Sequence, residues 1–85
     1  MRIIYSSKFS REYKKLPKKF KNIAEKQEQI FRKNPFDARL KTHKLHGKLK
    51  NFYSFSIGYK YRIIFEFNKK GNIYFHSVGV HTVYQ

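Results

Sequence analysis

Three groups of residues in this 85-residue chain could do chemistry on a phosphate. The segment 41–50 crowds lysines around two imidazoles, His43 and His46, a strand-like segment holds Arg62, and the tail carries another histidine. A histidine exchanges its proton near neutral pH, so beside a bound phosphate it can act as general acid or base in phosphodiester cleavage. A solvated charge run and structural histidines are the more ordinary explanations of such residues.

Arg62 is the most specific of these candidates, because it lies in the most hydrophobic strand-like segment of the chain. A guanidinium in such surroundings needs an anion, either a carboxylate or a phosphate. An ion pair with Glu66 or with the C-terminus would be a purely structural explanation. Residues four apart in a strand are separated by about 13 Å, which is too far for a direct contact with Glu66. We therefore favour a phosphate as the partner of Arg62.

The last residues of the chain carry His81 and Tyr84 directly after a strand-like segment. Tyr84 can stack on a nucleobase or donate its hydroxyl to a phosphate oxygen. The alternative is that Tyr84 only seals the hydrophobic core.

The composition of the chain limits the kinds of molecule it can bind and the cellular compartment in which it is expected. There are 20 Lys and Arg residues against 5 Asp and Glu, a net charge of +15, which favours a polyanionic partner. The absence of cysteine excludes disulfides and thiolate chemistry, and neither a HExxH nor a phosphate-loop motif is present, so we expect no metal and no cofactor. A zinc site made of histidines alone, from His43, His46, His76 and His81, is the alternative that spacing leaves open. The apolar start is too short for a signal peptide, and no segment approaches the ~20 apolar residues of a membrane span. We expect a cytoplasmic protein with no membrane association.

The elements that must position these residues follow from periodicity. A strand at 2–6 precedes a helix that Pro17 stops, and a second amphipathic helix runs from there to Asn34. Segment 37–50 has no sustained period and is predicted to be a basic loop. Alternation then predicts three strands, at 52–57, 61–67 and 72–80.

The predicted fold is α+β, a single domain over residues 1–85 in the order β-α-α-β-β-β. A helical hairpin packs on a mainly antiparallel four-stranded sheet. Ser54, Ser56 and Arg62 should lie on the sheet face away from the helices. His76 shares strand parity with Val78, which places it in or beside the core.

With these elements in place, the chain resembles the RelE/ParE superfamily of toxins over essentially its whole length. The residues that carry the resemblance are KLHGKL at 44–49, YRIIF at 61–65, SVG at 77–79 and the terminal His81 and Tyr84. The chain is most similar to the RelE, YoeB and YafQ branch, whose members are mRNA interferases of type II toxin-antitoxin systems.

The resemblance implies metal-free cleavage of mRNA in the A site of the 70S ribosome, in which the 2′-hydroxyl attacks the adjacent phosphate. Arg62 matches the arginine that holds the scissile phosphate, His81 the C-terminal catalytic histidine, and Tyr84 the terminal aromatic that stacks on the nucleotide. His43 falls where YafQ-like toxins have a histidine and YoeB-like toxins a glutamate. We expect His43 to be the base and His81 the acid, although the two roles could be exchanged. The resemblance also implies a cognate antitoxin, with an acidic, partly disordered segment that covers the active face.

The chain departs from its relatives at several positions. RelE has lysines where this chain has Ser54 and Ser56, and YafQ-like toxins have a histidine at Ser56 and an aspartate near Lys60. Nearby lysines would then supply the charge. The residues predicted to contact RNA are Lys41, Lys44, His46, Lys48, Lys50, Ser54, Ser56 and Lys60.

Two other functions fit the same fold or charge. A ParE-like toxin would poison DNA gyrase and needs no acid and base, and a non-catalytic module would only hold RNA. The set of His43, Arg62, His81 and Tyr84 disfavours the ParE-like toxin. The binding module stays open, and loss of cleavage with retained RNA binding in His81→Ala would favour the enzyme over it.

Overall fold

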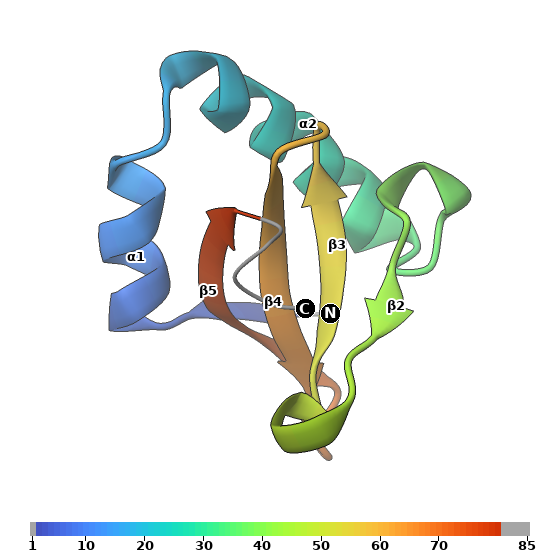
Figure 1. Cartoon of the computed structure of the whole chain (residues 1–85). Coiled ribbons are helices and arrows are strands. Elements are labelled where there is room, and N and C mark those ends of the chain that lie inside the picture. Colours follow the sequence, from blue (N-terminus) through green and yellow to red (C-terminus); the bar gives the residue numbers. More distant parts are fainter. Residues whose placement is uncertain (1, 81–85) are drawn as a thin grey trace.

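The computed structural model describes residues 2–80, which form two helices and a five-stranded sheet (Figure 1). The elements follow in the order β1 (Arg2–Tyr5), α1 (Ser7–Lys14), α2 (Lys18–Lys33), η1 (Ala38–Leu40), β2 (His43–Lys44), η2 (Gly47–Leu49), β3 (Tyr53–Ile57), β4 (Tyr61–Phe67) and β5 (Asn72–Val80). The strand order in the sheet is β1-β5-β4-β3-β2. β1 pairs with β5 in parallel, and the other pairs are antiparallel.

The α+β class and the β-α-α-β-β-β order are confirmed, but four strands was one too few. The fifth is the short β2 inside the predicted loop, where His43 pairs with Ser54 and Lys44 with Tyr53. Its two exposed residues give no alternating pattern, so it is a strand only because β3 offers it a hydrogen-bonding edge. Leu45 extends the contact, since its backbone N–H donates to the carbonyl of Phe52.

The helices begin and end where their local sequence dictates. Ser6 caps α1: its hydroxyl accepts from the N–H of Phe9 at 2.9 Å and donates to the carbonyl of His76 in β5 at 2.7 Å. This cap also ties the start of α1 to the sheet. Pro17 separates the two helices and precedes the first turn of α2, and α2 ends at Asn34, before Pro35.

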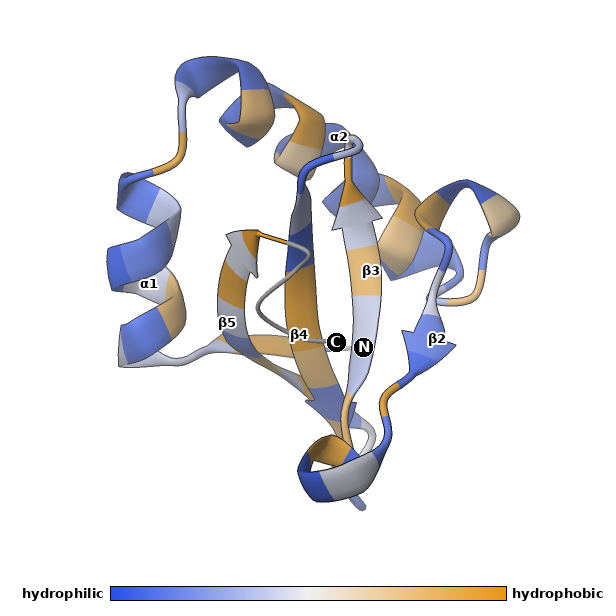
Figure 2. Cartoon of the chain, viewed as in Figure 1, coloured by the Kyte–Doolittle hydropathy of each residue, from blue (hydrophilic) through white to orange (hydrophobic). Residues whose placement is uncertain are grey.

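A cluster of aromatic rings between α2 and the sheet forms the centre of the core. Phe31 of α2 is fully buried, and its ring stacks on Phe55 at 4.8 Å between centroids. Its other neighbours are Phe65 at 4.9 Å and Phe75 at 5.4 Å, both in edge-on geometry. Figure 2 shows hydrophobic and hydrophilic residues mixed on both helices and a largely hydrophobic β4. The hydrophobic residues of α2 pack against one face of the sheet, and the opposite face is not covered by the described helices (Figure 1).

An irregularity in the pairing of β4 and β5 changes which side chains share a face. Ile64 pairs with Ser77 but Phe65 pairs with Phe75, so β5 contains one extra residue, His76. Phe75 and Val78 therefore both enter the core, although they are three residues apart. The prediction that His76 shares a face with Val78 was wrong, because the bulge shifts the alternation by one residue. His76 instead contacts Glu66, whose carboxylate is 2.9 Å from its Nε2 atom.

A polar network fastens β1 to α2 on the outside of this core. The hydroxyl of Tyr5 donates to Glu28 at 2.9 Å, and Arg32 contacts both residues, at 3.5 Å and 3.3 Å. Partial burial, followed by the hydrogen bond to Glu28, raises the pKa of Tyr5.

None of the described helices is both long and apolar enough to cross a membrane.

The network gives a prediction about stability. Tyr5→Phe should lower the free energy of unfolding at pH 7 by about 0.5–1.5 kcal/mol, because it removes the hydrogen bond to Glu28 and the longer one from Arg32. The pKa of Tyr5 is raised in the folded state, so the contribution is fully present below the unfolded value of about 10 and is lost as the pH rises through the folded value. Urea denaturation of both proteins at neutral and alkaline pH measures this. Tyr59→Phe is the control, because Tyr59 is 84% exposed; an equal effect of the two substitutions would contradict the prediction.

Candidate active site

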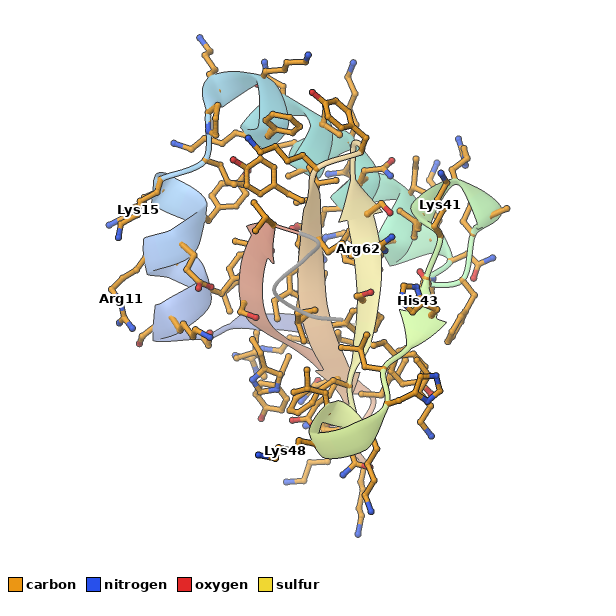
Figure 3. All side chains as sticks on the ribbon, viewed as in Figure 1. Arg11, Lys15, Lys41, His43, Lys48 and Arg62 are labelled. Carbon is orange, nitrogen blue, oxygen red and sulfur yellow. The ribbon has the colours of Figure 1, made fainter. Side chains whose placement is uncertain are left out.

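The site begins with Arg62, whose side chain projects from β4 on the sheet face away from the helices (Figure 3). Its cross-strand neighbours are Ser56 on β3 and Gly79 on β5, one a small residue and the other without a side chain. Arg62 is half-buried, its Nη1 atom is out of contact with solvent, and burial lowers the pKa of its guanidinium. Arginine nevertheless stays charged, and a partly desolvated cation attracts an anion more strongly than one in water. The predicted face of Arg62 is confirmed.

His43 lies on the same face, two strands further along the sheet, in β2. It pairs with Ser54, and residues directly opposite in a sheet share a face. Its Nδ1 atom is 3.2 Å from the carbonyl of Lys41, and its Nε2 atom is 3.5 Å from the hydroxyl of Ser54. A carbonyl only accepts, so Nδ1 carries the proton of the neutral ring and Nε2 holds the lone pair. The fold thus orients His43 as a histidine able to accept a proton at Nε2.

The backbone at Lys41 is what brings its carbonyl to this histidine. Lys41 ends η1 in the left-handed conformation, with φ at 53°, and is the only non-glycine residue with positive φ among the described residues. Thr42 then fixes the chain, because its hydroxyl donates to the carbonyl of Pro35 at 2.6 Å. The segment that leads into His43 is therefore held in place.

The two predicted serines lie beneath these groups. Ser54 is fully buried and Ser56 is 7% exposed. The hydroxyl of Ser54 lies 3.5 Å from Nε2 of His43, whereas Ser56 pairs with Arg62 in the adjacent strand. Ser54 therefore contacts His43, Ser56 is the cross-strand neighbour of Arg62, and contact with RNA stays a prediction for both serines.

Strand spacing sets the separation of His43 and Arg62. They are two strands and two residues apart, which corresponds to about 12 Å between Cα atoms. Both side chains lie on the open face (Figure 3), so a nucleotide between them can contact both.

Exposed lysines lie at the margins of this face, and one acid, Glu66, lies on it (Figure 3). The lysines and the histidine predicted to contact RNA are all exposed: Lys41, Lys44, Lys48, Lys50, Lys60 and His46. Lys44 pairs with Tyr53 and therefore belongs to the face opposite His43. Figure 3 shows Lys48 on η2 and Lys41 beside β2 at the margins of the view. Asp37 is paired with Arg39, whose hydrogen bonds lower the pKa of the Asp37 carboxyl to about 2. Glu66 is the acid on this face, and it pairs with His76.

Sequence reasoning missed the contribution of His76 and of a cavity beside it. A cavity of about 330 Å³ lies between the start of α1, η2 and the open face of β4 and β5. Phe52, Ile64 and His76 are among its lining residues. The one feature of the sequence that could have indicated this contact is Glu66, because an acid on a cationic face is expected to pair with a basic group. The bulge that supplies this partner has no signature in the sequence.

Two of the four predicted catalytic residues, His81 and Tyr84, lie outside the described residues. Within 2–80, no three histidine or acidic side chains gather in a way that could hold a metal ion.

Comparison with known proteins rests on the three-dimensional structure. No protein-family model and no curated protein match the chain. YafQ from E. coli strain BL21(DE3) superposes with a TM-score of 0.79 over 98% of this chain and 97% of its own, at 22% identity. A YoeB/ParE toxin from Agrobacterium tumefaciens gives a TM-score of 0.79 over 95% and 99%, at 13% identity.

A third match is the toxin-antitoxin complex RelBE2 from Mycobacterium tuberculosis, with a TM-score of 0.75 over 94% of this chain and 96% of that chain, at 17% identity. The chain has the RelE-like toxin fold. In this RelE-like structure, Arg62 and His43 come together on the open face of the sheet although they are 19 positions apart in sequence (62 − 43).

Proposed function

We propose that this protein is the toxin of a type II toxin-antitoxin system and a ribosome-dependent mRNA endoribonuclease that acts without a metal. One observation carries the proposal: a half-buried arginine and a histidine with a defined tautomer share one cationic face of a RelE-like fold. A gyrase poison or a passive RNA-binding module has no need of an oriented proton acceptor. The ribosome, as the site of action, places the protein in the cytoplasm.

The proposed reaction uses the substrate's own 2′-hydroxyl as nucleophile. His43 accepts the proton of the 2′-hydroxyl at Nε2, the nitrogen that holds the lone pair in the neutral tautomer favoured by the contact with Lys41. A bond forms between O2′ and phosphorus, the bond from phosphorus to O5′ breaks, and the leaving oxygen takes a proton from His81. The products are a 2′,3′-cyclic phosphate and a 5′-hydroxyl. Arg62 stabilises the extra negative charge of the phosphorane, and Tyr84 stacks on the nucleotide.

A neutralising antitoxin follows from the same surface. The RelBE2 match is a toxin-antitoxin complex, and the open face of this chain is rimmed by exposed lysines. We infer that the antitoxin presents an acidic segment that orders over Arg62 and His43. Such a segment would block the phosphate site directly.

Primer extension on a defined mRNA with translating ribosomes tests the proposal. Wild-type protein should produce codon-phased cuts with 5′-hydroxyl ends. His43→Gln keeps the hydrogen-bonding capacity of the side chain but cannot take a proton, so cleavage should fall by about 10²–10⁴-fold. Lys33→Gln is the control, because this exposed lysine lies at the end of α2, on the helix-covered side.

Other results would redirect the assignment. Absence of cleavage by the wild type would contradict the nuclease, and inhibition of DNA gyrase by the same preparation would replace it with a ParE-like activity. Retained cleavage by His43→Gln would keep the nuclease but remove His43 from the role of base.

A further inference from the structure

The cavity beside His76 lies next to the proposed cleavage site. Two of its lining residues, Ile64 and Ser77, are direct cross-strand partners on β4 and β5. Ile64 follows Arg62 by two positions on the same strand and the same face, so the two Cα atoms are separated by ~7 Å. That separation is on the scale of a single nucleotide. We call this cavity the Phe52 pocket.

The walls of the Phe52 pocket suit a flat, aromatic ligand. Ile64 and Leu49 are apolar, and the Phe52 ring meets His76 in edge-on geometry at 4.8 Å between centroids. A volume of about 330 Å³ falls at the lower end of the range of about 300–1,000 Å³ for small-ligand sites. Bases of single-stranded RNA are recognised in this way, splayed out and stacked on aromatic rings.

The pocket walls are held in place by hydrogen bonds. Glu66 accepts from Nε2 of His76 at 2.9 Å, which fixes the imidazole against Phe52. The backbone N–H of Phe52 donates to the carbonyl of Leu49 at 2.9 Å, which ties the backbone of Phe52 to the η2 turn. The capping Ser6 donates to the carbonyl of His76 on the other side. A preorganised wall loses little conformational entropy when a ligand binds.

The charges at the rim of the pocket favour an apolar ligand that also carries a negative charge. Lys8 lines the rim and is exposed, and the carboxylate of Glu66 is paired with His76. A ligand that joins an apolar ring to a negatively charged backbone satisfies both parts of the site. Arg62, where the phosphate is proposed to bind, lies two residues from Ile64 on the same strand.

We propose that the Phe52 pocket binds one nucleobase of the RNA strand, adjacent to the phosphate held by Arg62. The base stacks on Phe52 between Ile64 and His76, and Lys8 contacts the backbone of the same nucleotide. This inference rests on the proposed function, because it assigns a second contact to the same substrate. The pocket then contributes to the choice of nucleotide beside the cut.

Binding of short fluorescent RNAs tests the pocket without requiring cleavage. Each RNA carries a 2′-deoxy nucleotide at the cut position and one abasic site, which is moved along the strand, and anisotropy gives the affinity. Wild-type protein should show one position at which loss of the base weakens binding by about 5- to 150-fold, since stacking on an aromatic residue is worth ~1–3 kcal/mol. In Phe52→Leu this penalty should disappear, whereas Phe52→Tyr should retain it.

The control is Phe36→Leu, the same chemical change at an aromatic that is 56% exposed in the segment after α2, outside the pocket. It should leave the abasic profile unchanged, and circular dichroism checks that each variant is folded. Identical profiles for wild type and Phe52→Leu overturn the pocket, and so does a wild type that binds no RNA. If the protein binds RNA in a base-dependent way but does not cleave mRNA on ribosomes, the pocket proposal stands and the nuclease proposal fails. The failure of one proposal can therefore be told apart from the failure of the other.

Discussion

Arg62→Lys is expected to slow single-turnover mRNA cleavage by about 10²–10³-fold, the cost of removing one preorganised group that stabilises transition-state charge. Lysine keeps the positive charge, but its single ammonium cannot donate through two parallel N–H groups to two phosphate oxygens. The rest of the site offers no replacement, because Ser56 and Gly79, the cross-strand neighbours of Arg62, carry no charge. The loss should appear in the rate at saturating ribosomes, where chemistry rather than binding is measured.

The matched control for this variant is Arg39→Lys. Arg39 is an exposed arginine whose carboxylate partner, Asp37, lies 3.0 Å away in the neighbouring loop. It should cleave at the wild-type rate. If Arg62→Lys also cleaved at that rate, Arg62 would be a structural cation and the phosphate would have to bind elsewhere on the open face.

Phe31→Ala should destabilise the fold more than any other single substitution considered for this chain. Phe31 is fully buried and contacts Phe55, Phe65 and Phe75, which come from three different strands. Truncation of such a ring costs about 3–5 kcal/mol, because transfer free energy is lost and a cavity remains. Small domains have a total stability of only about 5–15 kcal/mol, so a large fraction of the protein would be unfolded at elevated temperature.

Urea denaturation followed by circular dichroism measures this loss, and Phe36→Ala is the control at a 56% exposed ring. The control should cost clearly less, about 0.5–1.5 kcal/mol, because among the aromatic rings of the described residues the half-exposed Phe36 ring contacts only Tyr53 and Phe67. Equal destabilisation by the two substitutions would show that the ring cluster around Phe31 is not the centre of the core.

The local sequence by itself determined the helices, the three long strands and the face on which Arg62 lies. Pro17 and Asn34-Pro35 end helices through steric and hydrogen-bonding effects that act within a few residues. The alternation of side chains in 61–67 assigns Arg62 to the face opposite Phe65 by geometry alone. Composition also predicted a cationic surface, because twenty basic side chains cannot be buried.

Tertiary structure decided the features that make this face a candidate site. β2 exists because β3 presents a free edge, and that pairing brings His43 opposite Ser54. The bulge at His76 depends on how β5 fits between β1 and β4, and it moves His76 out of the predicted core and next to Glu66. The tautomer of His43 follows from the left-handed turn at Lys41, and the Phe52 pocket from η2 closing over Ile64. Each of these features joins segments that are distant in the chain, and such contacts are set by packing rather than by local periodicity.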